Sequence, residues 1–381
     1  MIRSAYQYLK VLANPVDRFR TLGIPRLVPK GNFRVGNDAV IFRIVSEERV
    51  MMLKCYLRPP QAIAVRCACS QQTPLTAYCQ WLDRELTIDD EDGNEVEVGV
   101  MVGEWIEGRA LNDEILDAVI ERDKERLARL STEFDRFALA LLNEEWAHGD
   151  LKPENIICSP RGLRLVDVDS VYTPSLAGLT TTQLGTEGYR HPSRTETHFD
   201  RHLDDYPIAL ISATLAALAL DYDLYRRYDR GDGVLIDPSE AVECRSAAIA
   251  EMAKLFASAG DAAHSLILRS LRSPIHHLEG LNDALRQAIG AITANSELHL
   301  ATKGGYWGFI DDDDRWVIGA AYSSAFEFSE GYAAVCLGGV WQYIDQQGRP
   351  RLICPEADAI KPIRNGCARI RVEGEWREIE I

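Results

Sequence analysis

The chain has 381 residues, 46% hydrophobic and 26% charged, which is typical of a globular protein with two or three domains. A net charge of −16 and a pI near 5.0, with no basic patch, oppose a nucleic-acid partner. The longest apolar run, 207–220, is shorter than a bilayer span, so no membrane partner is expected.

The cysteines and the N-terminus indicate the compartment. The nine cysteines are scattered and form no CxxC pair, so neither a disulfide framework nor a zinc site is predicted from them. The first 22 residues contain no continuous apolar run of the secretory type. We therefore expect a cytoplasmic protein.

The first hundred residues are predicted to be mostly antiparallel sheet. Residues 1–20 have helical periodicity, and a second helix-compatible stretch covers 61–72. Period-two alternation and β-branched residues indicate strands in four segments: 39–45, 50–57, 76–82 and 96–106.

Helical periodicity dominates the next part of the chain, over 111–146 and again from about 204 to 292. The apolar run 207–220 within the second region predicts a helix that is buried on all sides. Strands followed by helices favour a two-lobed α+β fold.

The tail differs in kind because it repeats itself. Trp307, Trp341 and Trp376 recur 34 and 35 residues apart, and 328–335 matches 363–370 in phase. Agreement at two places in each period indicates an internal repeat, here of small β units. We expect the tryptophans to pack in the core of these units rather than to bind a ligand.

The stretch 147–170, AHGDLKPENIICSPRGLRLVDVDS, carries His148, Asp150, Lys152 and Asn155. Their spacing resembles the catalytic loop of the protein-kinase superfamily. Twelve residues beyond Asn155, Asp167 stands where kinases have D-F-G. Two later segments, LGTEGYRHPS (184–193) and DDYPIALI (204–211), resemble the end of an activation segment and the opening of the buried central helix.

The resemblance implies a binding site for ATP and Mg²⁺. Asp150 and Lys152 would be catalytic, and Asn155 and Asp167 would hold Mg²⁺. The nucleotide would also contact the following residues: Lys54, Gly36 and, in the hinge-like segment 103–108, Glu104 and Ile106. Taken singly, each has an ordinary structural alternative, such as a solvated lysine or an aspartate that caps a turn; their joint spacing favours the site.

The sequence also departs from the family. Only Gly31 and Gly36 stand in the glycine-loop region, and no acidic residue lies between Lys54 and Trp81 to pair with the lysine. Gln71 or Gln72 would replace the ion pair with a hydrogen bond, and Glu85 would serve only if the strand positions differ from those predicted. Gly149 replaces the arginine of H-R-D, and Val168-Asp169 replaces the phenylalanine and glycine of D-F-G.

The kinase resemblance covers roughly residues 30–290, and 303–381 resembles bacterial WG repeats. We expect a sheet-rich lobe with a helical extension over 1–105, a helical lobe over 106–295 and about three β-repeats over 296–381. The resemblance implies an ATP- and Mg²⁺-dependent Ser/Thr-type protein kinase whose repeats recruit a protein substrate or partner. The alternatives are a catalytically silent pseudokinase that serves as an interaction module and a small-molecule phosphotransferase.

Overall fold

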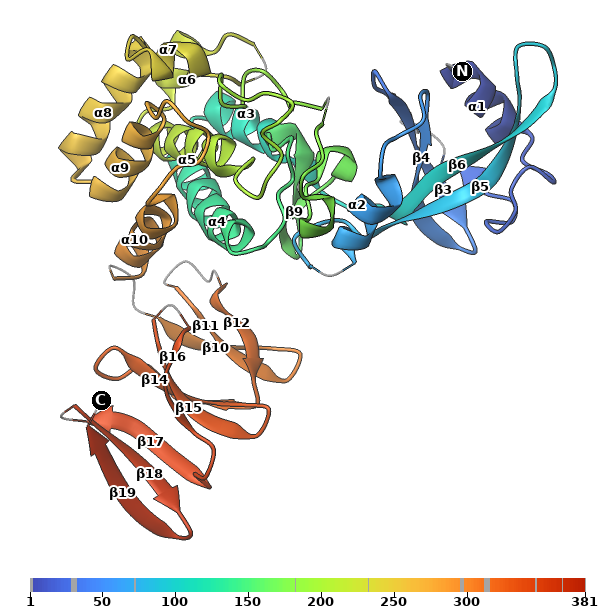
Figure 1. Cartoon of the computed structure of the whole chain (residues 1–381). Coiled ribbons are helices and arrows are strands. Elements are labelled where there is room, and N and C mark those ends of the chain that lie inside the picture. Colours follow the sequence, from blue (N-terminus) through green and yellow to red (C-terminus); the bar gives the residue numbers. More distant parts are fainter. Residues whose placement is uncertain are drawn as a thin grey trace. The chain divides into compact units, whose positions relative to one another are not determined.

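The computed structural model describes residues 3–28, 33–71, 73–181, 183–231, 233–294, 298–311, 316–346, 348–364 and 366–380 (Figure 1). The chain divides into two compact units, Met1–Leu285 and Arg286–Ile381. The first unit mixes helices and strands, and the second is built of antiparallel sheets after the end of one helix. The α+β class with an all-β repeat region is therefore confirmed.

The first unit begins with a helix and a six-stranded antiparallel sheet. The strand order is β1-β3-β4-β6-β5, with β2 paired to β3. Its elements are α1 (Ala5–Ala13), β1 (Arg26–Leu27), β2 (Phe33–Val35), β3 (Ala39–Ser46), β4 (Arg49–Tyr56), α2 (Ile63–Ser70), β5 (Cys79–Asp89) and β6 (Glu95–Glu104). The predicted hairpin is β3–β4, where Ile41 pairs with Lys54. The predicted helix within 61–72 is α2.

Helix α1 covers the sheet with its apolar side. Ser4 and Gln7 form a capping box that fixes its first turn. Tyr8, Val11 and Leu12 are buried in one apolar cluster with Phe42 and other sheet residues. The Tyr8 hydroxyl also donates a hydrogen bond to the Tyr56 carbonyl (2.6 Å), so α1 is tied to the strand that carries Lys54.

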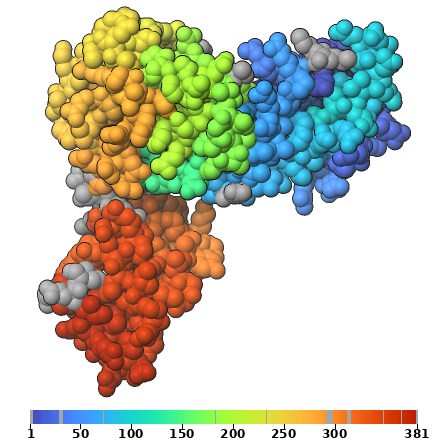
Figure 2. All heavy atoms as spheres, in the orientation of Figure 1, coloured from blue at the N-terminus to red at the C-terminus, as the bar shows by residue number. Residues whose placement is uncertain are grey.

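The rest of the first unit is mainly helical. Its elements are β7 (Arg109–Ala110), α3 (Leu111–Glu121), α4 (Lys124–Leu142), β8 (Ile156–Ser159), β9 (Gly162–Leu165), α5 (Asp205–Leu220), α6 (Asp223–Tyr228), α7 (Pro238–Val242), α8 (Ala247–Ala259), α9 (Ala262–Ser270) and α10 (Leu281–Ala294). Residues 205–218 of α5 are all buried, as the apolar run predicted. Figure 2 shows α8 and α9, in yellow and orange, at the outer surface.

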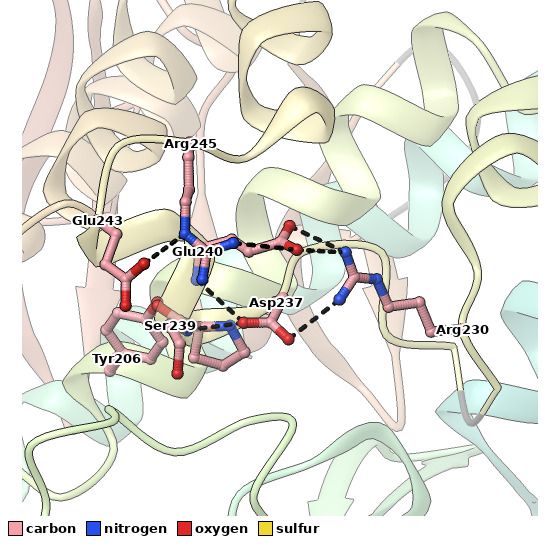
Figure 3. Close-up of polar contacts among 8 residues, drawn as sticks. Tyr206, Arg230, Asp237, Ser239, Glu240, Glu243 and Arg245 are labelled. Atoms are coloured by element: carbon pink, nitrogen blue, oxygen red, sulfur yellow. Dashed lines mark hydrogen bonds and ion pairs between the residues drawn. The ribbon is translucent and has the colours of Figure 1, made fainter.

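An ionic network fixes the turn that leads into α7 (Figure 3). Arg230 contacts Asp237 (3.1 Å) and Glu240 (2.9 Å), and the Asp237 side chain also accepts the backbone N–H of Ser239 and Glu240. Tyr206 of α5 donates a hydrogen bond to the Pro238 carbonyl (3.5 Å). The turn is thereby held against the buried helix.

The second unit contains three small antiparallel sheets that follow one another along the chain (Figure 1). Their strands are β10 (His299–Lys303), β11 (Tyr306–Ile310), β12 (Trp316–Tyr322), β13 (Ser324–Ala325), β14 (Tyr332–Leu337), β15 (Val340–Asp345), β16 (Pro350–Cys354), β17 (Ala359–Arg364), β18 (Cys367–Val372) and β19 (Glu375–Glu380). The middle sheet, β13–β16, buries Ala333 and Ile344 in a cluster with the first sheet and Ala334 and Tyr343 in a cluster with the third. Stacking neighbours therefore builds the core, as in other repeat proteins.

The hairpin turns of the second unit recur at the same spacing as the repeats. The hairpins β10–β11, β14–β15 and β18–β19 each turn through two residues with positive φ: Gly304-Gly305, Gly338-Gly339 and Glu373-Gly374. Two consecutive residues with positive φ are the requirement of a type I′ hairpin turn, which explains the repeated glycines.

The expectation that the tryptophans are core residues is wrong for two of the three. Trp307 is 36% exposed and Trp376 is 39% exposed, whereas Trp341 is partly buried against the third sheet. Each tryptophan lies close to the hairpin turn, where the sheet cannot cover a whole indole. The fully buried aromatic positions lie two residues further along, at Phe309 and Tyr343.

Candidate functional site

A cavity of about 340 Å³ lies within the first unit, where the sheet faces the helical half. Its walls are partly apolar, with Ile41, Met52, Ala77, Met101, Ile157, Val166 and Val168. Polar and charged side chains line the same space: Lys54, Glu104, Asn155 and Asp167, and also Arg34, Arg109, Asp113 and Glu154. A cavity in which apolar walls meet convergent polar groups is the usual form of a small-molecule site.

Lys54 stands at the centre of the polar wall. Its ammonium contacts Asp167 Oδ1 (2.6 Å) and Asp169 Oδ2 (2.8 Å), which belong to the segment after β9. Burial alone would lower the pKa of Lys54, but the two carboxylates outweigh burial and raise it. Lys54 therefore stays charged and joins the sheet to the helical half.

Asp169 supplies the acid partner that the sequence did not reveal. Two of the three residues considered for this role have other partners: Gln71 donates to the Cys79 carbonyl, and Glu85 accepts from Thr21 and Leu22. Gln72 lies outside the described residues. All three lie within 31 residues of Lys54 in the sequence. The actual partner is more than a hundred residues away in sequence.

Two buried side chains hold Asp169 in place. The Tyr56 hydroxyl donates to Asp169 Oδ1 (2.7 Å), and Arg66 of α2 donates to the Asp169 carbonyl. Arg66 also donates to Gln183 Oε1 (3.1 Å), and burial lowers the pKa of its guanidinium. Helix α2 thus contributes the cation Arg66, which contacts the site by its hydrogen bond to the Asp169 carbonyl.

Asp167 has an unusual backbone conformation. Its φ of 67° and ψ of 73° place a non-glycine residue in the left-handed region. Such positions persist where surrounding contacts hold them, and they concentrate at functional sites. The side chain remains 38% exposed. Burial would raise its pKa, but the Lys54 charge lowers it, so the carboxylate stays ionised beside the cavity.

Asn155 connects this wall to Asp150. Its side-chain nitrogen donates to the Asp150 carbonyl (2.9 Å) and to Asp150 Oδ2 (3.3 Å). The amide oxygen is the atom of Asn155 that these contacts do not use. The other carboxylate oxygen of Asp150 accepts from the backbone N–H (2.7 Å) and the hydroxyl (2.9 Å) of Thr186.

The loop that carries Asp150 is held by Asp204, at the start of α5. The Asp204 carboxylate accepts the backbone N–H groups of His148 and Gly149, and Arg194 donates to the Gly149 carbonyl (2.8 Å). The motif at 204–211 was recognised in the sequence, but this role of Asp204 was not. The buried acid directly before an apolar helix was the available signal.

The structure explains why position 149 is a glycine. Gly149 has a φ of 78°, and a Cβ at this position would lie 2.3 Å from the Ser170 carbonyl oxygen. An arginine could not occupy this backbone without moving the segment that carries Asp169. The glycine at position 149 is therefore required by its close approach to Ser170, the residue that follows Asp169.

Five of the sequence-predicted residues line the cavity together: Lys54, Glu104, Ile106, Asn155 and Asp167. Glu104 is engaged by Arg164 (2.8 Å), whose hydrogen bond lowers the pKa of the Glu104 carboxyl. Asp150 is not a lining residue, but its carboxylate accepts a hydrogen bond from Asn155, which is one. Gly36 and Lys152 are not among the lining residues, and the Gly36 N–H donates to the Ala39 carbonyl. Gly31 lies outside the described residues.

The repeat region matches a known family. The family model described as WG containing repeat matches residues 307–341 and 343–376. Residues 307–376 consist of WG repeats. The curated proteins contain no match to this chain. Among the described helices, none has both the length and the apolar character needed to cross a bilayer.

Proposed function

We propose that residues 30–290 form a protein-kinase-like phosphotransferase that uses ATP and Mg²⁺. One observation carries the proposal: Lys54 borders the same cavity as Asn155 and Asp167, which lie about a hundred residues further along the chain, and Lys54 contacts Asp167 at 2.6 Å. A lysine, an amide and a carboxylate are the groups that hold nucleotide phosphates and Mg²⁺ in phosphoryl transfer. Their motif spacing in the sequence supports the same assignment.

Each lining group has a place in this chemistry. The apolar wall around Ala77 and Met101 accepts the adenine, next to the backbone of 104–106. Lys54 contacts the phosphates. Asn155 and Asp167 offer hard oxygen atoms to Mg²⁺, which neutralises charge on the phosphates. Asp169 keeps the Lys54 ammonium in position when Asp167 turns to the metal.

Asp150 acts on the phosphoacceptor. Its Oδ1 accepts two hydrogen bonds from Thr186 and its Oδ2 accepts one long hydrogen bond from Asn155 (3.3 Å), so Oδ2 is the less engaged atom and faces the substrate hydroxyl in this proposal. The carboxylate takes the hydroxyl proton while the hydroxyl oxygen bonds to the γ-phosphorus. The bond between that phosphorus and the β,γ-bridging oxygen breaks, and ADP leaves. A Ser or Thr hydroxyl on a protein is the proposed acceptor.

The WG repeats recruit the protein substrate or partner in this proposal. The exposed indoles of Trp307 and Trp376 support it, because large aromatic side chains are enriched in protein interfaces. Trp376 lies under the Lys361 ammonium (4.5 Å to the ring centroid), which adds a positive charge to the same surface.

A pseudokinase is the second candidate, and one observation favours it. Lys54 is held by two carboxylates, so bound phosphates must compete with both for its charge. Gly36, in the glycine-loop region, does not line the cavity, so its backbone does not supply a second phosphate contact that would compensate for this competition.

Calorimetry with ATP, with and without Mg²⁺, tests the proposal on the full chain. We expect Asp167→Ala to abolish the Mg²⁺-dependent gain in ATP affinity. The matched control Asp83→Ala removes an equally charged but exposed acid and should bind like the wild type. Equal Mg²⁺ enhancement in Asp167→Ala and wild type would contradict the metal assignment.

Turnover then separates the two candidates. Labelled phosphate from ATP should enter a protein pool or the chain itself with the wild type, and Asp150→Asn should suppress this transfer while leaving ATP binding intact. ATP binding without transfer to any protein or small-molecule pool would favour the pseudokinase.

A further inference from the structure

Four of the eight histidines in the chain gather in one place, outside the cavity described above. His198 and His202 precede α5, and His276 and His277 follow α9. The ring centroids of His202 and His277 are 3.7 Å apart, and those of His198 and His276 are 4.7 Å apart. Two acids, Asp200 and Asp205, lie among these rings.

We propose that His202, Asp205 and His277 form a binding site for a divalent transition-metal ion, with Zn²⁺ as the best match. One ligand-type atom from each of the three residues lies within 4.8 Å of the other two. Two imidazoles and a carboxylate are a frequent protein ligand set for Zn²⁺ that leaves one position open.

The buried carboxylate is the first argument for an ion. Asp205 is only 3% exposed, and its Oδ2 contacts the Leu278 N–H (3.0 Å) and His202 Nδ1 (3.2 Å). Neither partner carries a permanent positive charge. A buried carboxylate with neutral partners pays a large desolvation cost, which a divalent cation offsets.

The close imidazole pair is the second argument. The centroids of the His202 and His277 rings are 3.7 Å apart, and the two rings bring imidazole nitrogens from two different segments next to the Asp205 carboxylate. A neutral imidazole presents a nitrogen lone pair, which is the form that binds a metal.

Space for the ion is the third argument. A hollow of about 150 Å³ is lined by His202, Asp205 and His277 together with Leu142 of α4, the charged side chains Arg201 and Glu279, and residues 278 and 280–282. Ligand atoms around Zn²⁺ are about 3.3 Å apart at ordinary bond lengths, so small side-chain rotations would close the present spacing. The remaining volume admits water or a small ligand as the fourth ligand.

An ion here would tie the segment after α9 to the first turn of α5. Asp205 directly follows Asp204, whose carboxylate holds the backbone of His148 and Gly149. Metal binding should therefore stabilise the start of α5 and the loop before Asp150. The inference does not depend on the proposed phosphotransferase activity.

The test uses the full chain, freed of metal with a chelator and kept without nucleotide. Zn²⁺ binding is measured by competition with a chromophoric chelator, and Co²⁺ is added as a spectroscopic probe. We expect one ion per chain, with affinity at least about tenfold weaker in His277→Ala and in His202→Ala. His299→Ala removes a histidine of the second unit and should bind like the wild type.

The Co²⁺ spectrum identifies the ligands, because thiolate ligands produce intense near-ultraviolet charge-transfer bands and nitrogen or oxygen ligands do not. We expect these bands to be absent and Zn²⁺ to raise the Tm of the wild type but not of His277→Ala. Unchanged affinity in both folded variants, thiolate bands, or no binding by the wild type would each overturn the proposal.

Discussion

Lys54 needs a carboxylate partner because a buried ammonium is costly without one. The partner comes from the segment after β9, where Asp167 and Asp169 approach the ammonium from one side. Tyr56, two residues from Lys54 on the same strand, holds Asp169 with a 2.7 Å hydrogen bond. Strand β4 therefore carries both the Lys54 ammonium and the Tyr56 hydroxyl that orients the Asp169 carboxylate.

A double-mutant cycle tests this pair. Lys54→Met and Asp169→Asn should each lower the free energy of unfolding by about 1–3 kcal/mol, because each removes a charged partner from a buried group that keeps only part of its contacts. The double variant should lose less than the sum, with a coupling of at least about 0.5 kcal/mol. Urea denaturation followed by circular dichroism measures all four proteins. Strictly additive losses would mean that the 2.8 Å contact contributes no coupling.

Buried charge also organises the packing of helices. Asp135 of α4 accepts a hydrogen bond from Ser212 of α5 (2.6 Å) and contacts His264 of α9 (3.0 Å). The other ring nitrogen of His264 contacts Asp261 at 2.6 Å. Side chains of three helices thus meet at the Asp135 carboxylate, and protonated His264 can donate to both Asp135 and Asp261.

The free energy of unfolding should decrease as pH rises, because His264 loses its proton. Burial opposes the charge, but the hydrogen bonds to Asp135 and Asp261 outweigh burial and raise the pKa of His264 to about 9. The folded chain therefore keeps a proton that the unfolded chain loses near pH 6.5. The stabilisation is complete below pH 6.5 and is lost as pH rises through 9, a change of up to about 3 kcal/mol.

His264→Gln is the variant that checks this slope. Unfolding free energies at several pH values should decline between pH 6.5 and 9 in the wild type and in His299→Ala, which lacks a histidine of the second unit. His264→Gln should be less stable at pH 6.5 and should show a smaller decline. A decline equal to that of the wild type would assign the pH dependence to other groups.

The cavity and the WG repeats are formed by different parts of the sequence. All residues that line the cavity lie between Arg34 and Val168, in the first unit. The WG repeats form their own apolar clusters from β-sheet residues. Cavity and repeats should therefore keep their functions when separated.

Deleting residues 298–381 should change the ATP dissociation constant by less than about twofold, because the truncated chain keeps every lining residue of the cavity. Calorimetry on the truncated and full chains makes the comparison, and circular dichroism checks that the helices remain. A folded truncated protein that no longer bound ATP would show that the repeats complete the site.

Local patterns were sufficient for the elements of the fold. Alternation predicted the β3–β4 hairpin, the apolar run predicted the buried helix α5, and the 34–35-residue period predicted an internal repeat; the WG family was suggested by resemblance and matches the family model. Each of these signals is carried by neighbouring residues or by a repeat, and burial follows from apolar periodicity. The exposure of Trp307 and Trp376 was missed because a period records a repeated position and not the depth of that position in the sheet.

The sequence by itself determined which residue types recur at the spacing of Lys54, Asp150, Asn155 and Asp167. The tertiary structure decided which acids pair with Lys54, why position 149 is a glycine, and that four histidines from two distant segments meet. The physical reason is that pairing and close packing depend on distances between different segments: 21 residues separate Gly149 from Ser170, and 76 separate Asp200 from His276. Such distances leave no periodic mark in a single sequence.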